Sequence, residues 1–200
     1  MLQRVFLARH GETAWSKSGR HTGRTDIALS EQGELNARML ARPLAGVGFR
    51  HVLTSPRQRA RRTCELAGLV ASAEIEPDLA EWDYGEYEGL SSDEIQRVNP
   101  GWELFSDGCP GGESPAQVAA RADRVIARLR AMEENIALFT HGHFGRALAA
   151  RWICLPIGDG ARFALETATL GILAYEHMSS ASPVIALWNA HPSSALIEGA

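Results

Sequence analysis

Hydrophobic residues follow two patterns along this chain: short continuous apolar runs, and longer stretches in which they recur every three or four positions. The short runs predict buried strands at 4–8 and 51–54, and the periodic stretches predict helices over 30–45 and 55–69. The expected N-caps are Ser30 and Ser55, the second followed by Pro56 in the first helical position. The expected buried stripe of the first helix is Leu35, Met39, Leu40 and Leu44.

The second half of the chain continues this alternation after an interruption. A Gly- and Pro-rich excursion over 81–113, with a short helix expected near 92–98, has the composition of a lid. A capping box with proline at its second position opens a long helix at Ser114. The remaining predicted elements are a buried strand at 136–140, a helix over 144–154 and two β-rich runs at 170–175 and 184–188.

Strands that alternate with helices are typical of α/β proteins. The pattern predicts a three-layer α/β sandwich in which a mostly parallel sheet carries helices on both faces. A chain of 200 residues can bury one sizeable core, so a single domain over 1–200 is expected.

Charge, cysteine content and the lengths of the apolar runs indicate which partners and which cell compartment to expect. A net charge of −4 argues against a nucleic-acid partner. Nineteen of the twenty basic residues are arginine, which suits bidentate phosphate binding and is equally explained by genome composition. The three separated cysteines, Cys64, Cys109 and Cys154, are expected to be free thiols. No run reaches membrane-spanning length and no signal peptide is evident, so a cytoplasmic protein without a membrane partner is expected.

Three predicted strands are followed by basic side chains. Arg9 and His10 follow the first strand in the sequence R-H-G-E-T, His141 follows the strand at 136–140, and Arg59 follows the strand at 51–54. Because the carboxyl ends of parallel strands meet at one edge of a sheet, these side chains are expected to converge there. A neutral His10 could attack phosphorus if its other ring nitrogen donated to a backbone carbonyl.

These segments, with the pattern E-x-x-x-G-x-x-E-G at 81–89, resemble the histidine phosphatase superfamily, which includes cofactor-dependent phosphoglycerate mutases. The resemblance implies a phosphoglycerate-mutase-like fold and transfer of phosphoryl groups through a phosphohistidine. It implies that His10 is the nucleophile and that Arg9, Arg59 and His141 bind the phosphoryl oxygens. It also implies that Glu81, rather than Asp83, Glu86 or Glu88, protonates the leaving group and later activates water.

The loop after the first strand is the expected substrate-binding segment. Thr22 and Gly23 resemble a phosphate-contacting pair of the family, and Ser16 stands where many members carry asparagine. This loop is similar to that of members acting on sugar bisphosphates such as sedoheptulose bisphosphate. A second phosphate could then meet Lys17, Arg20, His21 and Arg24, which in the plainer interpretation form a solvated loop; Gly142, after the second histidine, completes the expected binding set.

Three alternatives remain open at this stage. His141 and His143 could bind a metal, but no helical H-E-x-x-H and no cysteine-based site accompanies them, so a reaction without metal or other cofactor is predicted. A phosphoglycerate mutase would carry a longer basic insertion, whereas the arginines here fall on one helix, so a phosphatase acting on a small phosphorylated molecule is favoured. A catalytically silent phospho-ligand binder is the third alternative. The oligomeric state is left undecided, with a homodimer possible.

Overall fold

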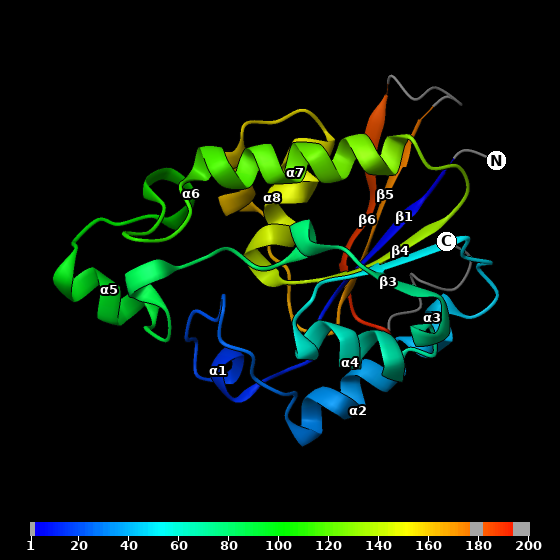
Figure 1. The fold of residues 1–200 in the computed structure, drawn as a ribbon, viewed down its shortest axis with the longest axis horizontal. Coiled ribbons are helices and arrows are strands. Elements are labelled where there is room, and N and C mark those ends of the chain that lie inside the picture. Colours follow the sequence, from blue (N-terminus) through cyan, green and yellow to red (C-terminus); the bar gives the residue numbers. More distant parts are fainter. Residues whose placement is uncertain (1–2, 177–181, 194–200) are drawn as a thin grey trace.

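A six-stranded sheet in the order β3-β2-β4-β1-β5-β6 forms the centre of the computed structural model, which describes residues 3–176 and 182–193 (Figure 1). Strands β3, β2, β4 and β1 are parallel, and β5 and β6 add antiparallel pairs beside β1. The predicted mostly parallel α/β fold is therefore confirmed. The strands are β1 (Val5–Arg9), β2 (His51–Thr54), β3 (Ala73–Ile75), β4 (Ile136–Thr140), β5 (Leu170–Tyr175) and β6 (Pro183–Ala190).

Helices cover both faces of this sheet, because alternate residues of each strand point to opposite sides. Val5 and Leu7 of β1 share a core with α7 and α8, whereas Phe6 and Ala8 share a core with α3 and α4 (Figure 1). The helices are α1 (Ala14–Lys17), α2 (Glu31–Met39), α3 (Ala41–Leu44), α4 (Gln58–Leu66), α5 (Ser92–Val98), α6 (Leu104–Asp107), α7 (Pro115–Arg130) and α8 (Gly142–Trp152). Short 3₁₀ turns lie at 70–72, 77–79, 85–87 and 157–162.

The helix predicted over 30–45 is two helices. Ser30 caps α2 as expected, but the helix ends at Met39 and α3 follows after Leu40. Pro43 has no N–H to donate to the Met39 carbonyl, so the α-helical ladder cannot continue through this point. The expected stripe is also half wrong: Leu40 and Leu44 are buried, whereas Leu35 is 58% and Met39 46% exposed.

The helix after β2 also begins later than predicted. Its N-cap is Arg57 rather than Ser55, and α4 starts at Gln58. The Gln58 amide donates 2.8 Å to a carboxylate oxygen of Asp26, which belongs to a distant loop. Ser55 lies before the helix, where its hydroxyl accepts from the Arg57 amide at 3.3 Å. Helix α4 also ends earlier than predicted, at Leu66 rather than at Leu69. Strand β3 was not predicted, because two of its three residues are exposed and the segment has no continuous apolar run.

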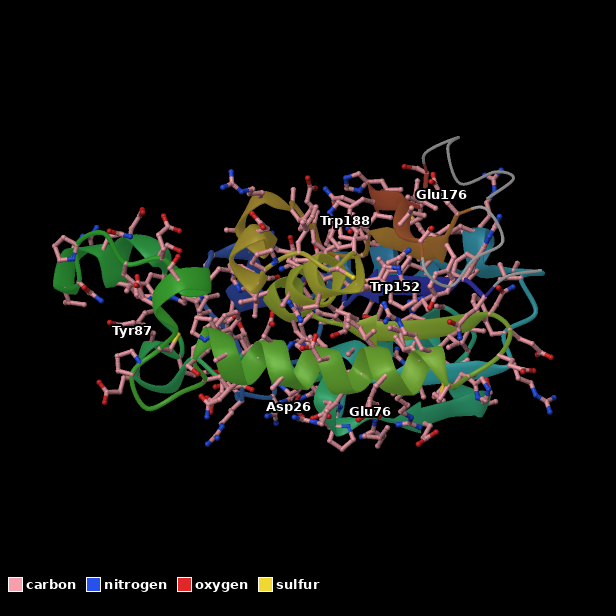
Figure 2. All side chains as sticks on the ribbon, turned by 90° about the horizontal axis from the view of Figure 1, so that it is seen from above. Asp26, Glu76, Tyr87, Trp152, Glu176 and Trp188 are labelled. Atoms are coloured by element: carbon pink, nitrogen blue, oxygen red, sulfur yellow. The ribbon has the colours of Figure 1, made fainter. Side chains whose placement is uncertain are left out.

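The excursion over 81–113 packs into the same core as α7 and α8. Trp82, Tyr84, Ile95, Trp102 and Phe105 are buried in that cluster. Its outer part, with α5 and the labelled Tyr87, extends from one end of the molecule, as Figures 1 and 2 show. The predicted short helix at 92–98 and the capping box before α7 are confirmed. The role of the excursion as a lid stays a prediction.

Candidate active site

The carboxyl ends of β1, β2 and β4 bring the predicted basic residues together. Arg9 is the last residue of β1, His141 directly follows β4, and Arg59 lies in the first turn of α4 after β2. The rings of His10 and His141 are 5.2 Å apart between centroids, and Arg59 Nε lies 3.2 Å from His141 Nδ1. The expected convergence at one sheet edge is therefore present.

His10 is held in one tautomer. Its Nδ1 atom lies 2.7 Å from the carbonyl oxygen of Gly11, which can only accept a hydrogen bond. Burial, reinforced by the positive charges of Arg59 and Arg9, holds the pKa of His10 well below its usual value. A neutral ring with its proton on Nδ1 leaves Nε2 with a free lone pair, and His10 lines a pocket of about 220 Å³.

Arg9 lies in the same pocket against Gly142. Its Nη1 donates 2.5 Å to the Leu165 carbonyl, and its buried Nε has no hydrogen-bond partner among the described residues. A Cβ at position 142 would lie 3.1 Å from the Arg9 Cζ, so glycine gives the guanidinium room. Burial lowers the pKa of Arg9 from its usual value, although a guanidinium stays charged in proteins.

Arg59 and His141 are completely buried and bond to each other and to the surrounding loop. Because a guanidinium only donates, His141 Nδ1 accepts from Arg59, and its Nε2 must donate to the hydroxyl of Ser55, 2.7 Å away. The remaining nitrogens of Arg59 donate to the carbonyls of Thr25 (3.0 Å) and Thr22 (2.8 Å). Burial, with the charge of Arg59, keeps the pKa of His141 well below its usual value. Neither Arg59 nor His141 is among the residues that line the pocket, so their contact with a phosphoryl group stays a prediction.

Glu81 places a carboxylate at the N-terminus of α8. Its Oε1 accepts from the amides of Trp82 (2.9 Å) and Phe144 (2.7 Å), and its Oε2 accepts from the amide of His143 (3.0 Å). Helix N-termini favour negative charge, because their first amides lack partners within the helix. Glu81 is buried and lines the pocket.

The other carboxylates of this segment are engaged or exposed. Asp83 forms an ion pair with Arg24 at 2.7 Å, and Glu86 is exposed. Glu88 accepts from the amide of Gly23 at 3.0 Å. The structure therefore distinguishes the position of Glu81 from those of its sequence neighbours.

Three residues that line the pocket, Tyr84, His143 and Arg146, are outside the predicted catalytic and substrate-binding set, although His143 was considered as a metal ligand. The Tyr84 hydroxyl is hydrogen-bonded to His143 Nδ1 at 2.6 Å, and burial raises the pKa of Tyr84 well above its usual value and lowers that of His143 well below, so both groups are neutral. Arg146 lines the same wall and donates its Nε to the Gly160 carbonyl at 3.0 Å. Positions 143 and 146 are one turn apart on α8, and a helix starting at 142 rather than 144 would have pointed to them.

The predicted substrate-binding loop is only partly at the pocket. Ser16 and Thr22 line it, together with Arg20 and His21. The Gly23 amide is instead bonded to Glu88. Lys17, with 71% of its side chain exposed, faces Glu12 at 3.9 Å, and Arg24 pairs with Asp83. Gly23, Lys17 and Arg24 are thus not among the residues that line the pocket, and each lies against a carboxylate that does not line it either. Their substrate-binding role stays a prediction.

The cysteines, possible metal ligands and helix lengths bear on the expectations from the sequence. Cys64 and Cys109 are buried free thiols, and Cys154 is an exposed one. Within residues 3–176 and 182–193, no group of three His, Cys, Asp or Glu side chains is placed to hold a metal ion. In the same part of the chain, no helix has the length and apolar character needed to cross a membrane.

Comparisons with known proteins cover almost the whole chain. The family model for the histidine phosphatase superfamily (branch 1) matches residues 5–191. An acid phosphatase of Mycobacterium tuberculosis is 46% identical over 87% of each chain, and sedoheptulose 1,7-bisphosphatase of Saccharomyces cerevisiae is 29% identical over 92% of each. A solved structure of a Mycobacterium tuberculosis open reading frame superposes with a TM-score of 0.89 at 41% identity, covering 95% of this chain and 98% of that chain.

Proposed function

Because the chain belongs to the histidine phosphatase superfamily (branch 1), we propose that it hydrolyses a small phosphate monoester through a phosphohistidine on His10. The observation that carries this proposal is the His10–Gly11 hydrogen bond, which leaves Nε2 of a neutral ring as a nucleophile in the pocket. A nucleophilic histidine divides hydrolysis into two easier displacements.

In the first displacement, His10 Nε2 forms a bond to phosphorus while the bond between phosphorus and the ester oxygen breaks. Glu81 enters this step protonated and gives its proton to the departing oxygen, and the amides of Trp82, His143 and Phe144 stabilise the carboxylate that is left. Arg9, Arg59 and His141 stabilise the charge on the phosphoryl oxygens, so this chemistry needs no metal. In the second displacement, Glu81 removes a proton from water, the water oxygen bonds to phosphorus, and the bond to Nε2 breaks.

The pocket supports a small polar substrate such as a sugar phosphate or bisphosphate. Its volume of about 220 Å³ is bounded by the neutral hydrogen-bonding groups of Tyr84 and His143 and by the arginines Arg20 and Arg146. Arg20 also pairs with Glu94 at 3.1 Å, so a second phosphate would compete with that carboxylate. The relative from Saccharomyces cerevisiae is named for a sugar bisphosphate, which agrees with this substrate class.

Trapping the intermediate tests the proposal. Brief incubation with a ³²P-labelled sugar phosphate and an alkaline quench should leave acid-labile label on the wild type and on His51→Ala, but none on His10→Ala. Label that stays on His10→Ala would contradict the nucleophile. Wild-type protein that binds phosphate esters without becoming labelled would favour a silent binder, and label passed to a second phosphorylated metabolite rather than to water would favour a mutase.

A further inference from the structure

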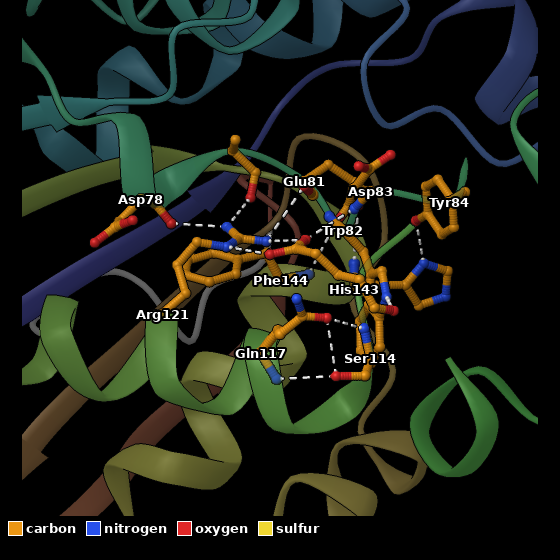
Figure 3. A network of polar contacts seen from close by, with 12 residues as sticks. Asp78, Glu81, Trp82, Asp83, Tyr84, Ser114, Gln117, Arg121, His143 and Phe144 are labelled. Carbon is orange, nitrogen blue, oxygen red and sulfur yellow. Dashed lines mark hydrogen bonds and ion pairs between the residues drawn. The ribbon is translucent and has the colours of Figure 1, made fainter. Parts of the chain in front are cut away.

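Arg121 of α7 lies beneath the segment that carries Glu81. Its Nη1 donates to the carbonyls of Asp78 (2.8 Å) and Ala80 (2.5 Å), and its Nη2 donates to the carbonyl of Glu81 (3.3 Å). Figure 3 shows this guanidinium between the segment and the start of α8. The buried Arg121 side chain therefore bonds three backbone carbonyls, one of Glu81 itself and two of the three residues before it.

Glu113, at the far end of the excursion, completes the arrangement. Its carboxylate pairs with Arg121 through contacts of 2.9 and 2.8 Å and also accepts from the amide of Asp83 at 2.9 Å. The Glu113 amide donates back to the Asp83 carbonyl at 2.9 Å, and its own carbonyl accepts from the Trp82 indole at 2.9 Å. The two ends of the excursion are thus joined, and Arg121 joins both to α7.

Arg121 also contacts the residue that holds the Glu81 carboxylate. Its guanidinium carbon lies 4.3 Å from the centre of the Phe144 ring, and the Phe144 amide makes the 2.7 Å bond to Glu81 Oε1. The same arginine therefore touches the backbone of Glu81 and the start of α8, the two parts whose relative placement sets the carboxylate.

We propose that Arg121, together with Glu113, is a positioning residue that fixes the Glu81 carboxyl against the N-terminus of α8. This inference rests on the proposed function for its kinetic consequence. Arg124 makes the contrast clear, because it follows on the same helix and pairs with Asp78 at 2.8 and 2.9 Å but only through the side chain, largely in solvent.

A double-mutant cycle with Glu81 separates positioning from general scaffolding. For an alkyl phosphate, Arg121→Gln should slow phosphoryl transfer by roughly 10- to 100-fold, the scale of a misplaced catalytic group. With p-nitrophenyl phosphate, whose leaving group needs no proton, the first step should change by less than about threefold. In the Glu81→Gln background, Arg121→Gln should slow phosphoryl transfer from the alkyl phosphate by less than about a further threefold, because the carboxyl that Arg121 positions is already gone. Arg124→Gln should behave as wild type throughout.

Equal slowing of both substrates, or undiminished slowing in the Glu81→Gln background, would overturn the inference. If Arg121→Gln does not fold, Glu113→Gln and Arg121→Lys make the same test. Each of these side chains is close in size to the one it replaces but loses part of the hydrogen bonding between Arg121, Glu113 and the Glu81 segment. Each should show the leaving-group dependence of Glu81→Gln in weaker form.

Hydrogen exchange at the amides of Trp82, His143 and Phe144 tests the placement without turnover. Exchange there should rise by about tenfold in Arg121→Gln relative to Arg124→Gln, as local opening becomes easier. Unchanged exchange contradicts the inference whatever the activity. If exchange rises in Arg121→Gln but the wild type forms no phosphohistidine, only the proposed function is contradicted.

Discussion

The Nδ1 atom of His10 lies 2.7 Å from the carbonyl oxygen of Gly11, and this peptide is itself held in place. The Gly11 amide donates 3.0 Å to the hydroxyl of Thr63 in α4, and that hydroxyl donates 2.7 Å to the Arg59 carbonyl. The orientation of the His10 ring is therefore tied to the helix that carries a second predicted phosphate ligand.

This relationship predicts the atom that receives phosphate. Because Nδ1 carries the proton, the phosphoryl group should be attached to Nε2 of His10. ³¹P NMR of the alkali-quenched intermediate, compared with the two synthetic phosphohistidine isomers, checks the assignment. Phosphate on Nδ1 would mean that the Gly11 hydrogen bond is broken during turnover.

The close contact beneath the same loop predicts an unusual effect of alanine. A Cβ on Gly33 of α2 would lie 2.1 Å from the Glu12 carbonyl oxygen, too close for any real contact. Alanine normally stabilises a helix by about 1 kcal/mol over glycine, but overpacking costs about 1–3 kcal/mol. Gly33→Ala should therefore lower the Tm by several degrees.

The matched control is Gly158→Ala, because nothing lies within 4 Å of a Cβ at that position. Its Tm should stay within about 2 °C of wild type, the range expected for a substitution without new contacts. Differential scanning calorimetry of both variants compares them. An equal or higher Tm for Gly33→Ala would show that the loop at 11–12 can move away from α2.

Local signals in the sequence were enough for much of the site. Arg9, His10 and His141 each follow a continuous apolar run, and buried parallel strands read as such runs. The order of strands then places their ends together, so the convergence was predictable. The Ser114 capping box was also predictable, because both partners lie within four residues.

Contacts between distant segments were not predictable in this way. The acceptor for the first amide of α4 is Asp26, 32 residues before Gln58, and the expected cap Ser55 instead bonds His141. The Arg121 contact with the Ala80 carbonyl joins residues 41 apart. No periodicity or motif indicates such pairs, because they depend on how the elements pack.

His21 predicts how stability depends on pH. Burial lowers its pKa to about 4, against an ordinary value of about 6.5, and its ring lies 4.7 Å from Tyr84 and 5.6 Å from His143, with the Ser92 hydroxyl 3.5 Å from its Nε2. The unfolded chain therefore takes up a proton below about pH 6.5 that the folded protein resists until about pH 4. Protonation favours unfolding over this window, so the stabilisation is present above pH 6.5 and is lost as the pH falls.

Between pH 7 and pH 5 this residue should cost about 2 kcal/mol of unfolding free energy. Urea titrations at both pH values measure this: the free energy of unfolding should fall by about 2 kcal/mol less in His21→Asn than in wild type between pH 7 and pH 5. The pKa values of His10, His141 and His143 are also lowered and act in the same direction. The variant should therefore keep part of the dependence of unfolding free energy on pH. Identical pH dependence in the two proteins would show that His21 is not buried in the neutral form.

The last prediction distinguishes Glu81 from the other carboxylates of its segment. Protonation of the leaving group matters most when that group is a basic alkoxide, so Glu81→Gln should slow phosphoryl transfer from a sugar phosphate by about a hundredfold or more. An aryl phosphate should lose less in this first step. Its turnover should nevertheless show a burst followed by a slow phase, because water must still attack the phosphohistidine without a base.

Rapid-quench kinetics with both substrates checks this expectation, with two matched variants as controls. Glu86→Gln removes an exposed carboxylate and should behave as wild type. Asp83→Asn breaks the ion pair with Arg24 and should have a smaller effect than Glu81→Gln, because Glu81 is the carboxylate of the two that lines the pocket with His10. A larger defect in Asp83→Asn, or equal slowing of both substrates by Glu81→Gln, would assign the proton donor to another group.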